Sequence, residues 1–160
     1  MGDIAHLDLV DQEIVLLLQE DADRSVREIA ELVGLTATPC WRRIQRLEES
    51  GVIAKRVALM DPEALNVGVT VLVEIRTNQH GAEWLNAFRA GIETFPEIIE
   101  AYRMSGEIDY LLKVVVPDIA AYDDFYRRLI EVVDLYDVRS SFAMERIKDT
   151  TALPLTYLPG

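Results

Sequence analysis

The chain has 160 residues, with 16 lysines and arginines against 28 aspartates and glutamates, and a formal net charge of −12. Half of the residues are hydrophobic and 28% are charged, a composition typical of a folded protein rather than a disordered one. This acidity argues against a general coat for nucleic acids or anionic membranes. It still permits DNA binding through a local patch, because salt screens charges beyond about 8–10 Å.

The remaining composition indicates a cytoplasmic protein. Cys40 is the only cysteine, so no intramolecular disulfide can form. The first residues have no basic segment followed by an apolar core, so no signal peptide is evident. No apolar run approaches the ~18–20 residues that span a bilayer, and we expect no membrane partner.

The first sixty residues have helical periodicity. Asp8 is the expected N-cap of a first helix, and Ser25 and Glu28 form a capping-box pair at the start of a second. Gly34 ends that helix, and Thr36 follows almost at once as the N-cap of a third. This spacing predicts a helix-turn-helix, and the β-prone residues 52–59 predict a wing strand after it.

The third predicted helix separates apolar from basic residues. Ala37, Cys40, Ile44 and Leu47 share one face, which predicts that this face docks the helix on the first two. The opposite face and its flanks carry Thr38, Trp41, Arg42, Arg43, Gln45 and Arg46. The inward position makes Cys40 a core residue rather than a nucleophile.

This outward face predicts a recognition helix in a DNA major groove. Arginine pairs with guanine, glutamine with adenine, and threonine or tryptophan can contact a thymine methyl. The residues expected to contact bases are Thr38, Trp41, Arg42 and Gln45, and those expected to contact phosphates are Arg43, Arg46, Lys55 and Arg56. The alternative is a solvated helix whose arginines pair with Glu48 and Glu49, but the surrounding helix-turn-helix favours DNA.

From about Val67 the pattern changes to that of a sheet. The predicted elements run strand, helix, strand, strand, helix, strand, which is the ferredoxin-like βαββαβ arrangement. We therefore expect an α+β protein with a winged helix-turn-helix domain at 1–60, a hinge at 61–66 and a ferredoxin-like domain at 67–160.

The segment MSGEIDYLLKVVV, from Met104 to Val116, joins two of these strands. Its glycine and aspartate suit a simple hairpin connection. They equally suit a ligand site, where glycine admits a close approach and Glu107 or Asp109 meets an ammonium group. We expect no enzyme activity, metal or cofactor, because His6 and His80 are isolated and no activating partner for the acids is evident.

Several motifs in one order resemble the Lrp/AsnC (leucine-responsive, feast/famine) family of transcription factors. They are LDLVDQEIVLLLQED at the start, VGLTATPCWRRIQRLEESGVI, DPEAL at the hinge and SGEIDYLLKV in the second half. The resemblance covers nearly the whole chain. Two positions depart from the family pattern: Glu107 replaces a common aspartate, and Ala54-Lys55-Arg56 stands where Gly-Tyr is frequent.

The resemblance implies a sequence-specific DNA-binding regulator with a RAM-type sensing domain. It implies that dimers pair through their sheets and assemble into octamers, and that the effector is an amino acid. The implied effector-binding residues are Gly106, Glu107, Asp109, Tyr110, Ser140 and Ser141. Two other functions stay open, an architectural protein that compacts DNA and an amino-acid sensor that modulates a partner protein.

Overall fold

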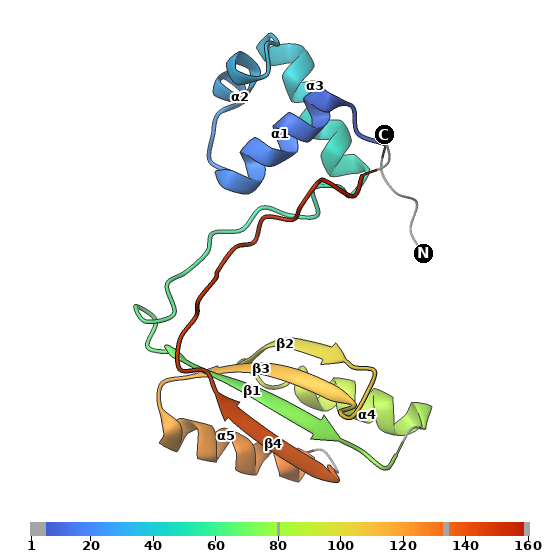
Figure 1. The fold of residues 1–160 in the computed structure, drawn as a ribbon, viewed down its shortest axis with the longest axis vertical. Coiled ribbons are helices and arrows are strands. Elements are labelled where there is room, and N and C mark those ends of the chain that lie inside the picture. The colour runs from blue at the N-terminus through green and yellow to red at the C-terminus, as the bar shows by residue number, and fades with distance from the viewer. Residues whose placement is uncertain (1–5, 80, 133–134, 159–160) are drawn as a thin grey trace. The chain divides into compact units, whose positions relative to one another are not determined.

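The computed structural model describes residues 6–79, 81–132 and 135–158, so His80 lies outside the described residues. The chain forms two compact units (Figure 1). The helical unit comprises Met1–Ala58 together with Lys148–Gly160, and the sheet unit comprises Leu59–Ile147.

The helical unit contains three helices: α1 (Leu9–Glu20), α2 (Val26–Leu32) and α3 (Ala37–Glu49). The predicted caps are confirmed at the first two. The Asp8 carboxylate accepts the Asp11 N–H at 2.8 Å, and Ser25 and Glu28 exchange the bonds of a capping box. Thr36 has the extended backbone of an N-cap at α3, but its side chain makes no capping bond. These caps satisfy N–H groups that the first turn of a helix leaves unpaired.

The core of the helical unit contains the apolar face predicted for α3. Cys40, Ile44 and Leu47 are buried against Ile14 and Ile29 of the other two helices. Burial raises the pKa of the Cys40 thiol, which suits a core residue and not a nucleophile. The inward face of α3 therefore fixes which side chains point outward.

The C-terminal segment also belongs to the helical unit, contrary to the expected boundary that placed residues 67–160 in one domain. Leu155 and Leu158 pack against the core of the helical unit. The Gln19 side chain bonds both ways with the Leu153 backbone, accepting its N–H at 2.6 Å and donating to its carbonyl at 3.2 Å. The partners are 134 residues apart, so no local pattern could predict them.

The predicted wing strand is wrong. No residue between Gly51 and Gly68, a stretch described throughout, is in a strand, and Val57 and Leu59 are largely exposed. β-propensity alone does not form a strand, because the backbone also needs a neighbouring strand with which to bond. No other strand pairs with this stretch within the described chain.

The sheet unit confirms the ferredoxin-like prediction. Its elements are β1 (Val69–Arg76), α4 (Ala82–Ile92), β2 (Ile98–Arg103), β3 (Tyr110–Val116), α5 (Ile119–Val132) and β4 (Asp137–Phe142). The sheet order is β2-β3-β1-β4, with every neighbouring pair antiparallel. The end of β1 therefore lies beside the start of β3 and the start of β4.

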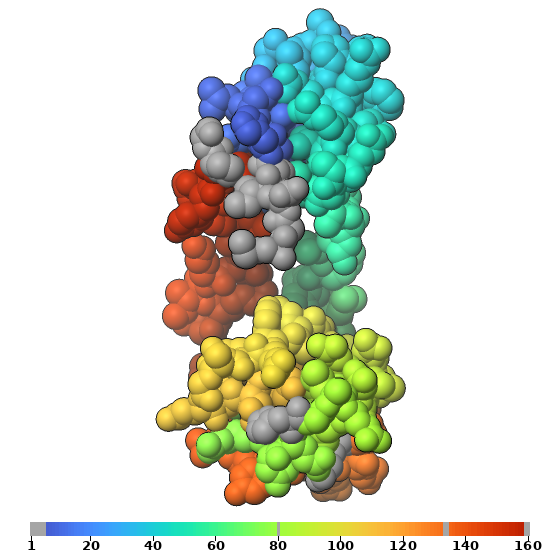
Figure 2. Space-filling model, turned by 90° about the vertical axis from the view of Figure 1, so that its right-hand side faces the viewer, coloured from blue at the N-terminus to red at the C-terminus, as the bar shows by residue number. Residues whose placement is uncertain are grey.

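One face of this sheet is covered by helices. Val71, Val73 and Ile75 of β1 are fully buried and form one core with Phe88 of α4 and Phe125 of α5. Figure 2 views the unit from a side where α4 and the β2 region form its surface. Residues that alternate with the buried ones point to the other face, which no element of the sheet unit covers. The described helices include none long and apolar enough to cross a membrane.

Candidate functional site

The outward face of α3 begins with exposed residues near the helix N-terminus. Thr38, Trp41 and Arg42 are exposed, and Trp41 has 51% of its surface accessible despite its size. Arg42 has no ion-pair partner among the residues that the structure describes. A large aromatic ring beside an unpaired guanidinium is suited to contact bases and phosphates.

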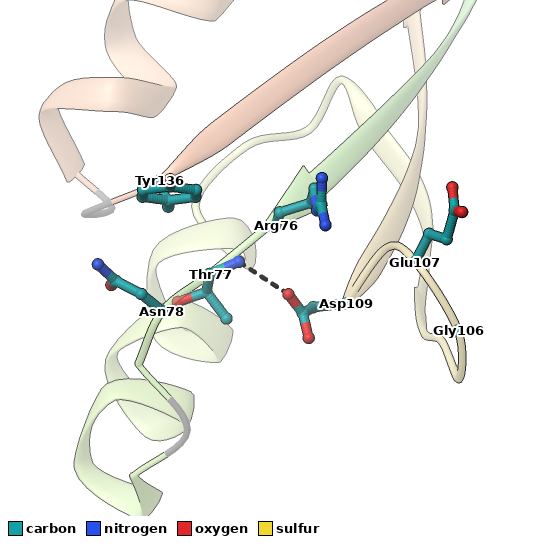
Figure 3. Close-up of a pocket in the computed structure, with 7 residues that line it drawn as sticks. All are labelled: Arg76, Thr77, Asn78, Gly106, Glu107, Asp109 and Tyr136. Atoms are coloured by element: carbon teal, nitrogen blue, oxygen red, sulfur yellow. Dashed lines mark hydrogen bonds between the residues drawn. The ribbon is translucent and has the colours of Figure 1, made fainter.

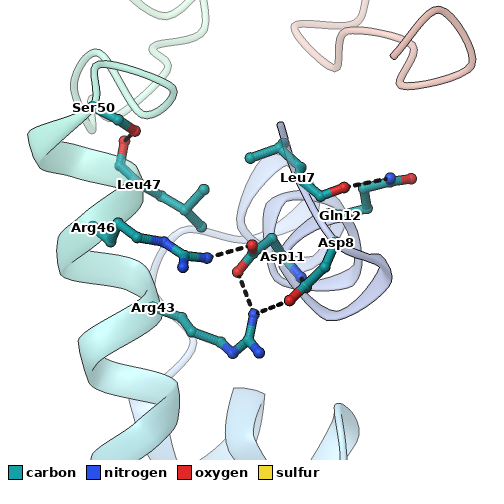
Figure 4. A network of polar contacts seen from close by, with 8 residues as sticks. All are labelled: Leu7, Asp8, Asp11, Gln12, Arg43, Arg46, Leu47 and Ser50. Atoms are coloured by element: carbon teal, nitrogen blue, oxygen red, sulfur yellow. Dashed lines mark hydrogen bonds and ion pairs between the residues drawn. The ribbon is translucent and has the colours of Figure 1, made fainter. Parts of the chain in front are cut away.

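The other two arginines of α3 are bound to carboxylates of α1 (Figure 4). One nitrogen of Arg43 donates to Asp8 and to Asp11, each at 2.7 Å, and Arg46 bonds the second oxygen of Asp11. Only 2% of the Asp11 side chain is exposed, against 28% for Arg43 and 60% for Arg46. We call these four residues the α1–α3 charge network.

The network shifts the pKa values of Asp8 and Arg43. The hydrogen bond from Arg43 lowers the pKa of Asp8, helped by the bond from the Asp11 backbone N–H. The same carboxylates raise the pKa of Arg43, with the bond to Asp8 as the first cause. Asp8 is the N-cap of α1 and Asp11 lies in its first turn, where the helix dipole favours negative charge. The pairing therefore favours the charged forms of Asp8 and Arg43.

The alternative pairing of these arginines with Glu48 and Glu49 does not occur. Glu48 instead accepts Gln45 at 2.9 Å and Arg56 at 2.8 Å. The bond to Arg56 ties the segment after α3 back to the helix. Gln45 and Arg56 would have to release Glu48 to contact DNA, whereas Lys55 is exposed and unpaired within the described chain.

A second candidate site lies at one end of the sheet (Figure 3). A pocket of about 350 Å³ is formed by the end of β1, the β2–β3 loop and the residue before β4. Its lining residues are Arg76, Thr77, Asn78, Gly106, Glu107, Asp109 and Tyr136. The sheet order brings these three segments together. The sequence pattern had indicated only the β2–β3 loop, and not the lining residues at the end of β1 or before β4.

Asp109 also holds the local structure. Its carboxylate accepts the Thr77 N–H at 2.8 Å, its own N–H donates to Ile75, and its carbonyl accepts the Met104 N–H. Gly106 has a φ of +124°, which an L residue rarely adopts, so the loop requires glycine there. The hairpin interpretation of this loop is therefore correct, and it coexists with a pocket.

Three of the predicted effector residues lie outside this pocket. Tyr110 is buried, with its ring 4.4 Å from that of Phe88. Ser140 is bonded to Tyr122 of α5 on the helix-covered face, whereas Ser141 pairs opposite Leu72 and so points to the other face. Ser140 and Ser141 point to opposite faces because neighbouring strand residues alternate, and the assignment of all three residues to an effector site stays a prediction.

The residues missed from the sequence are Arg76, Thr77, Asn78 and Tyr136. A signal was present at Arg76, a cation at the end of an alternating strand. The pocket presents this guanidinium together with the carboxylates of Glu107 and Asp109. Within the described residues no group of three His, Cys, Asp or Glu side chains is arranged to hold a metal ion.

Comparison with protein families identifies both units. The AsnC-type helix-turn-helix domain matches residues 7–48, and the Lrp/AsnC ligand binding domain matches residues 70–153. The second match includes part of the C-terminal segment that packs on the helical unit.

Individual relatives match over nearly the full length. The DNA-binding transcriptional activator DecR of Escherichia coli is 47% identical over 93% of this chain and 99% of its own. The glutamate uptake regulatory protein of Zymomonas mobilis is 47% identical over 95% of this chain and 93% of its own.

Solved structures agree with this assignment. An AsnC family transcriptional regulator from Agrobacterium tumefaciens has 56% identity and a TM-score of 0.93, covering 96% of this chain and all of that one. A transcriptional regulator from Neisseria meningitidis, solved as a complex with L-Met, has 32% identity and a TM-score of 0.91, with the same coverage. The chain therefore belongs to the Lrp/AsnC family of DNA-binding transcriptional regulators.

Proposed function

We propose that this regulator binds operator DNA through the outward face of α3 and responds to an amino acid bound at the end of its sheet. The observation that carries the proposal is the exposed set Thr38, Trp41 and Arg42 at the start of the second helix of a helix-turn-helix. In this motif the N-terminal residues of that helix reach the base edges.

The assignment of contacts follows from which side chains are available. Thr38, Trp41 and Arg42 need no rearrangement to meet DNA, and Gln45 contacts bases after releasing Glu48. Lys55 is the phosphate contact supported by its exposure and lack of a partner. Binding then weakens with salt despite the acidic total charge, because phosphate contacts release counterions.

The pocket at the sheet edge supports an amino-acid effector. Arg76 offers a partner for a carboxylate, and Glu107 offers one for an ammonium group. A free amino acid carries both groups, and the Neisseria relative was solved with L-Met. Gly106, without a side chain, leaves the loop backbone accessible beside them.

The uncovered face of the sheet supports homodimers that assemble into octamers. Leu72 and Tyr102 are exposed on that face, beside the partly exposed Leu111 and Val115. These apolar side chains share the face with the Lys113–Glu100 ion pair, and exposed apolar residues rimmed by polar ones mark an interaction site. The assembly should have a mass that is a multiple of 18.1 kDa in light scattering.

The protein is cytoplasmic and acts by binding rather than by catalysis.

Selection of binding sites from random duplex DNA tests this function. Wild type should recover roughly palindromic sites whose half-sites are one or more helical turns apart. Arg42→Ala should weaken binding to the recovered site and lower the preference for the base that Arg42 contacts. Gln45→Ala should lower the preference for one base position, by about 1–3 kcal/mol if the contact is bidentate.

The outcomes separate the competing functions. Operator affinity and sequence preference that are unchanged in both variants would refute the assignment to α3. Tight DNA binding with no sequence preference and no response to amino acids would favour an architectural protein. Amino-acid binding with no affinity for any duplex at low salt would favour a sensor that modulates a partner protein.

A further inference from the structure

The α1–α3 charge network leaves few free cations on the helical unit. Its two carboxylates and two guanidiniums balance each other, and three of its contacts are direct ion pairs between α1 and α3. Between residues 9 and 58, all described, every lysine and arginine except Arg42 and Lys55 pairs with a carboxylate. The positive charge that the sequence concentrates in α3 is therefore largely neutralised within the fold.

Release of these arginines to DNA would be unfavourable. Arg43 donates to two carboxylate oxygens at 2.7 Å, and a phosphate would have to replace both. Loss of Arg43 and Arg46 would leave Asp11, only 2% exposed, as a buried charge without a partner. An uncompensated buried charge is strongly destabilising. Arg42, exposed and unpaired, exchanges only water for a phosphate or a base.

We infer that Asp11, with Asp8, withholds Arg43 and Arg46 from DNA phosphates. This inference rests on the proposed function and assigns Asp11 as a positioning residue that sets the balance between specific and non-specific DNA binding. The attraction to phosphates grows with the number of available cations and carries no sequence information. Because two of the three arginines of α3 are paired with carboxylates, this attraction is lower. Discrimination between DNA sequences then depends on the base-contacting residues.

The test compares Asp11→Asn and Asp8→Asn with the matched control Glu13→Gln. Glu13 is an exposed carboxylate of the same helix with no partner within the described chain, so its neutralisation changes the total charge equally. Fluorescence anisotropy over roughly 50–200 mM salt would give the affinity of each protein for a random-sequence duplex and for the selected operator.

The inference predicts a larger salt slope when the network is neutralised. Asp11→Asn should steepen the slope by up to about 0.9 per bound protomer, corresponding to one additional phosphate contact. Affinity for the random duplex should rise more than affinity for the operator, so their ratio falls. Asp8→Asn should change both in the same direction but less, because Arg43 keeps its bond to Asp11. Glu13→Gln should match wild type.

The substitutions are chosen so that an effect on DNA binding can be distinguished from loss of folding. Asparagine is as good an N-cap as aspartate, so Asp8→Asn keeps the cap of α1 and tests the inference even if Asp11→Asn unfolds. Circular dichroism and urea unfolding would establish that each variant is folded.

Three results would overturn the inference. Slopes equal to that of Glu13→Gln would mean that only the total charge matters. Slopes that fall would mean that the carboxylates orient the arginines toward phosphates. Wild-type protein that binds no duplex would refute the proposed function itself, and this inference with it.

Discussion

Replacement of Asp109 separates a structural role from an effector-binding role. In Asp109→Ala the Thr77 N–H loses its acceptor, at 2.8 Å, in a residue only 8% exposed. Hydrogen bonds to charged groups contribute about 1.5–3 kcal/mol, and a buried donor left unpaired costs a similar amount. We therefore expect Asp109→Ala to lower the free energy of unfolding by about 2 kcal/mol in urea titrations.

Asp109→Asn is the informative companion variant. The amide oxygen of asparagine can still accept the Thr77 N–H, so stability should remain within about 1 kcal/mol of wild type. The negative charge in the pocket is lost, so calorimetry should show weaker effector binding while basal DNA binding persists. Glu107→Gln removes the other carboxylate of the pocket without affecting the bond to Thr77, so it is the control for stability and should also weaken effector binding.

Two results would refute this reasoning. A urea midpoint for Asp109→Ala equal to that of wild type would show that the bond to Thr77 contributes nothing to stability. Unchanged effector titration in Asp109→Ala, Asp109→Asn and Glu107→Gln would show that the pocket is not the effector site.

Two further predictions concern the two units separately. Phe125 is fully buried between α5 and the sheet, so Phe125→Ala should cost about 3–5 kcal/mol of unfolding free energy in urea, and a cost below 1 kcal/mol would contradict this packing. Glu28 accepts bonds from the Ser25 hydroxyl and N–H, which hold its pKa below the ordinary value of 4.5. A carboxyl whose pKa is lowered by folding stabilises the protein above about pH 4.5 and loses this contribution as pH falls through its folded value. The stability difference between wild type and Glu28→Gln, from urea unfolding at several pH values, should therefore shrink in acid, and a pH-independent difference would be inconsistent.

Local signals made much of the fold predictable. The Asp8 cap, the Ser25–Glu28 capping box and the apolar stripe of α3 each depend on residues within about one helical turn. The alternation of residues 69–76 likewise matches the burial observed along β1. These features follow from periods of 3.6 and 2 residues, which the sequence displays directly.

Features that depend on distant contacts were not predictable in this way. Arg43 and Arg46 carry the same sequence signal as Arg42, yet their partner Asp11 lies 32 and 35 residues away. The hydrophobic pattern does not distinguish an arginine paired in this way from one free to meet DNA. Tyr110 shows the same limit, because it follows the pocket residue Asp109 directly but points into the core.

The most direct test of this account is one titration of fluorescent operator DNA with wild-type protein, repeated with each free amino acid. We expect sequence-specific binding that weakens with salt, and at least one amino acid that shifts the dissociation constant. That shift should be absent in Glu107→Gln, because Glu107 lines the pocket at the end of the sheet and is not part of α3. Operator affinity that no amino acid changes, or a shift that persists unchanged in Glu107→Gln, would contradict the account.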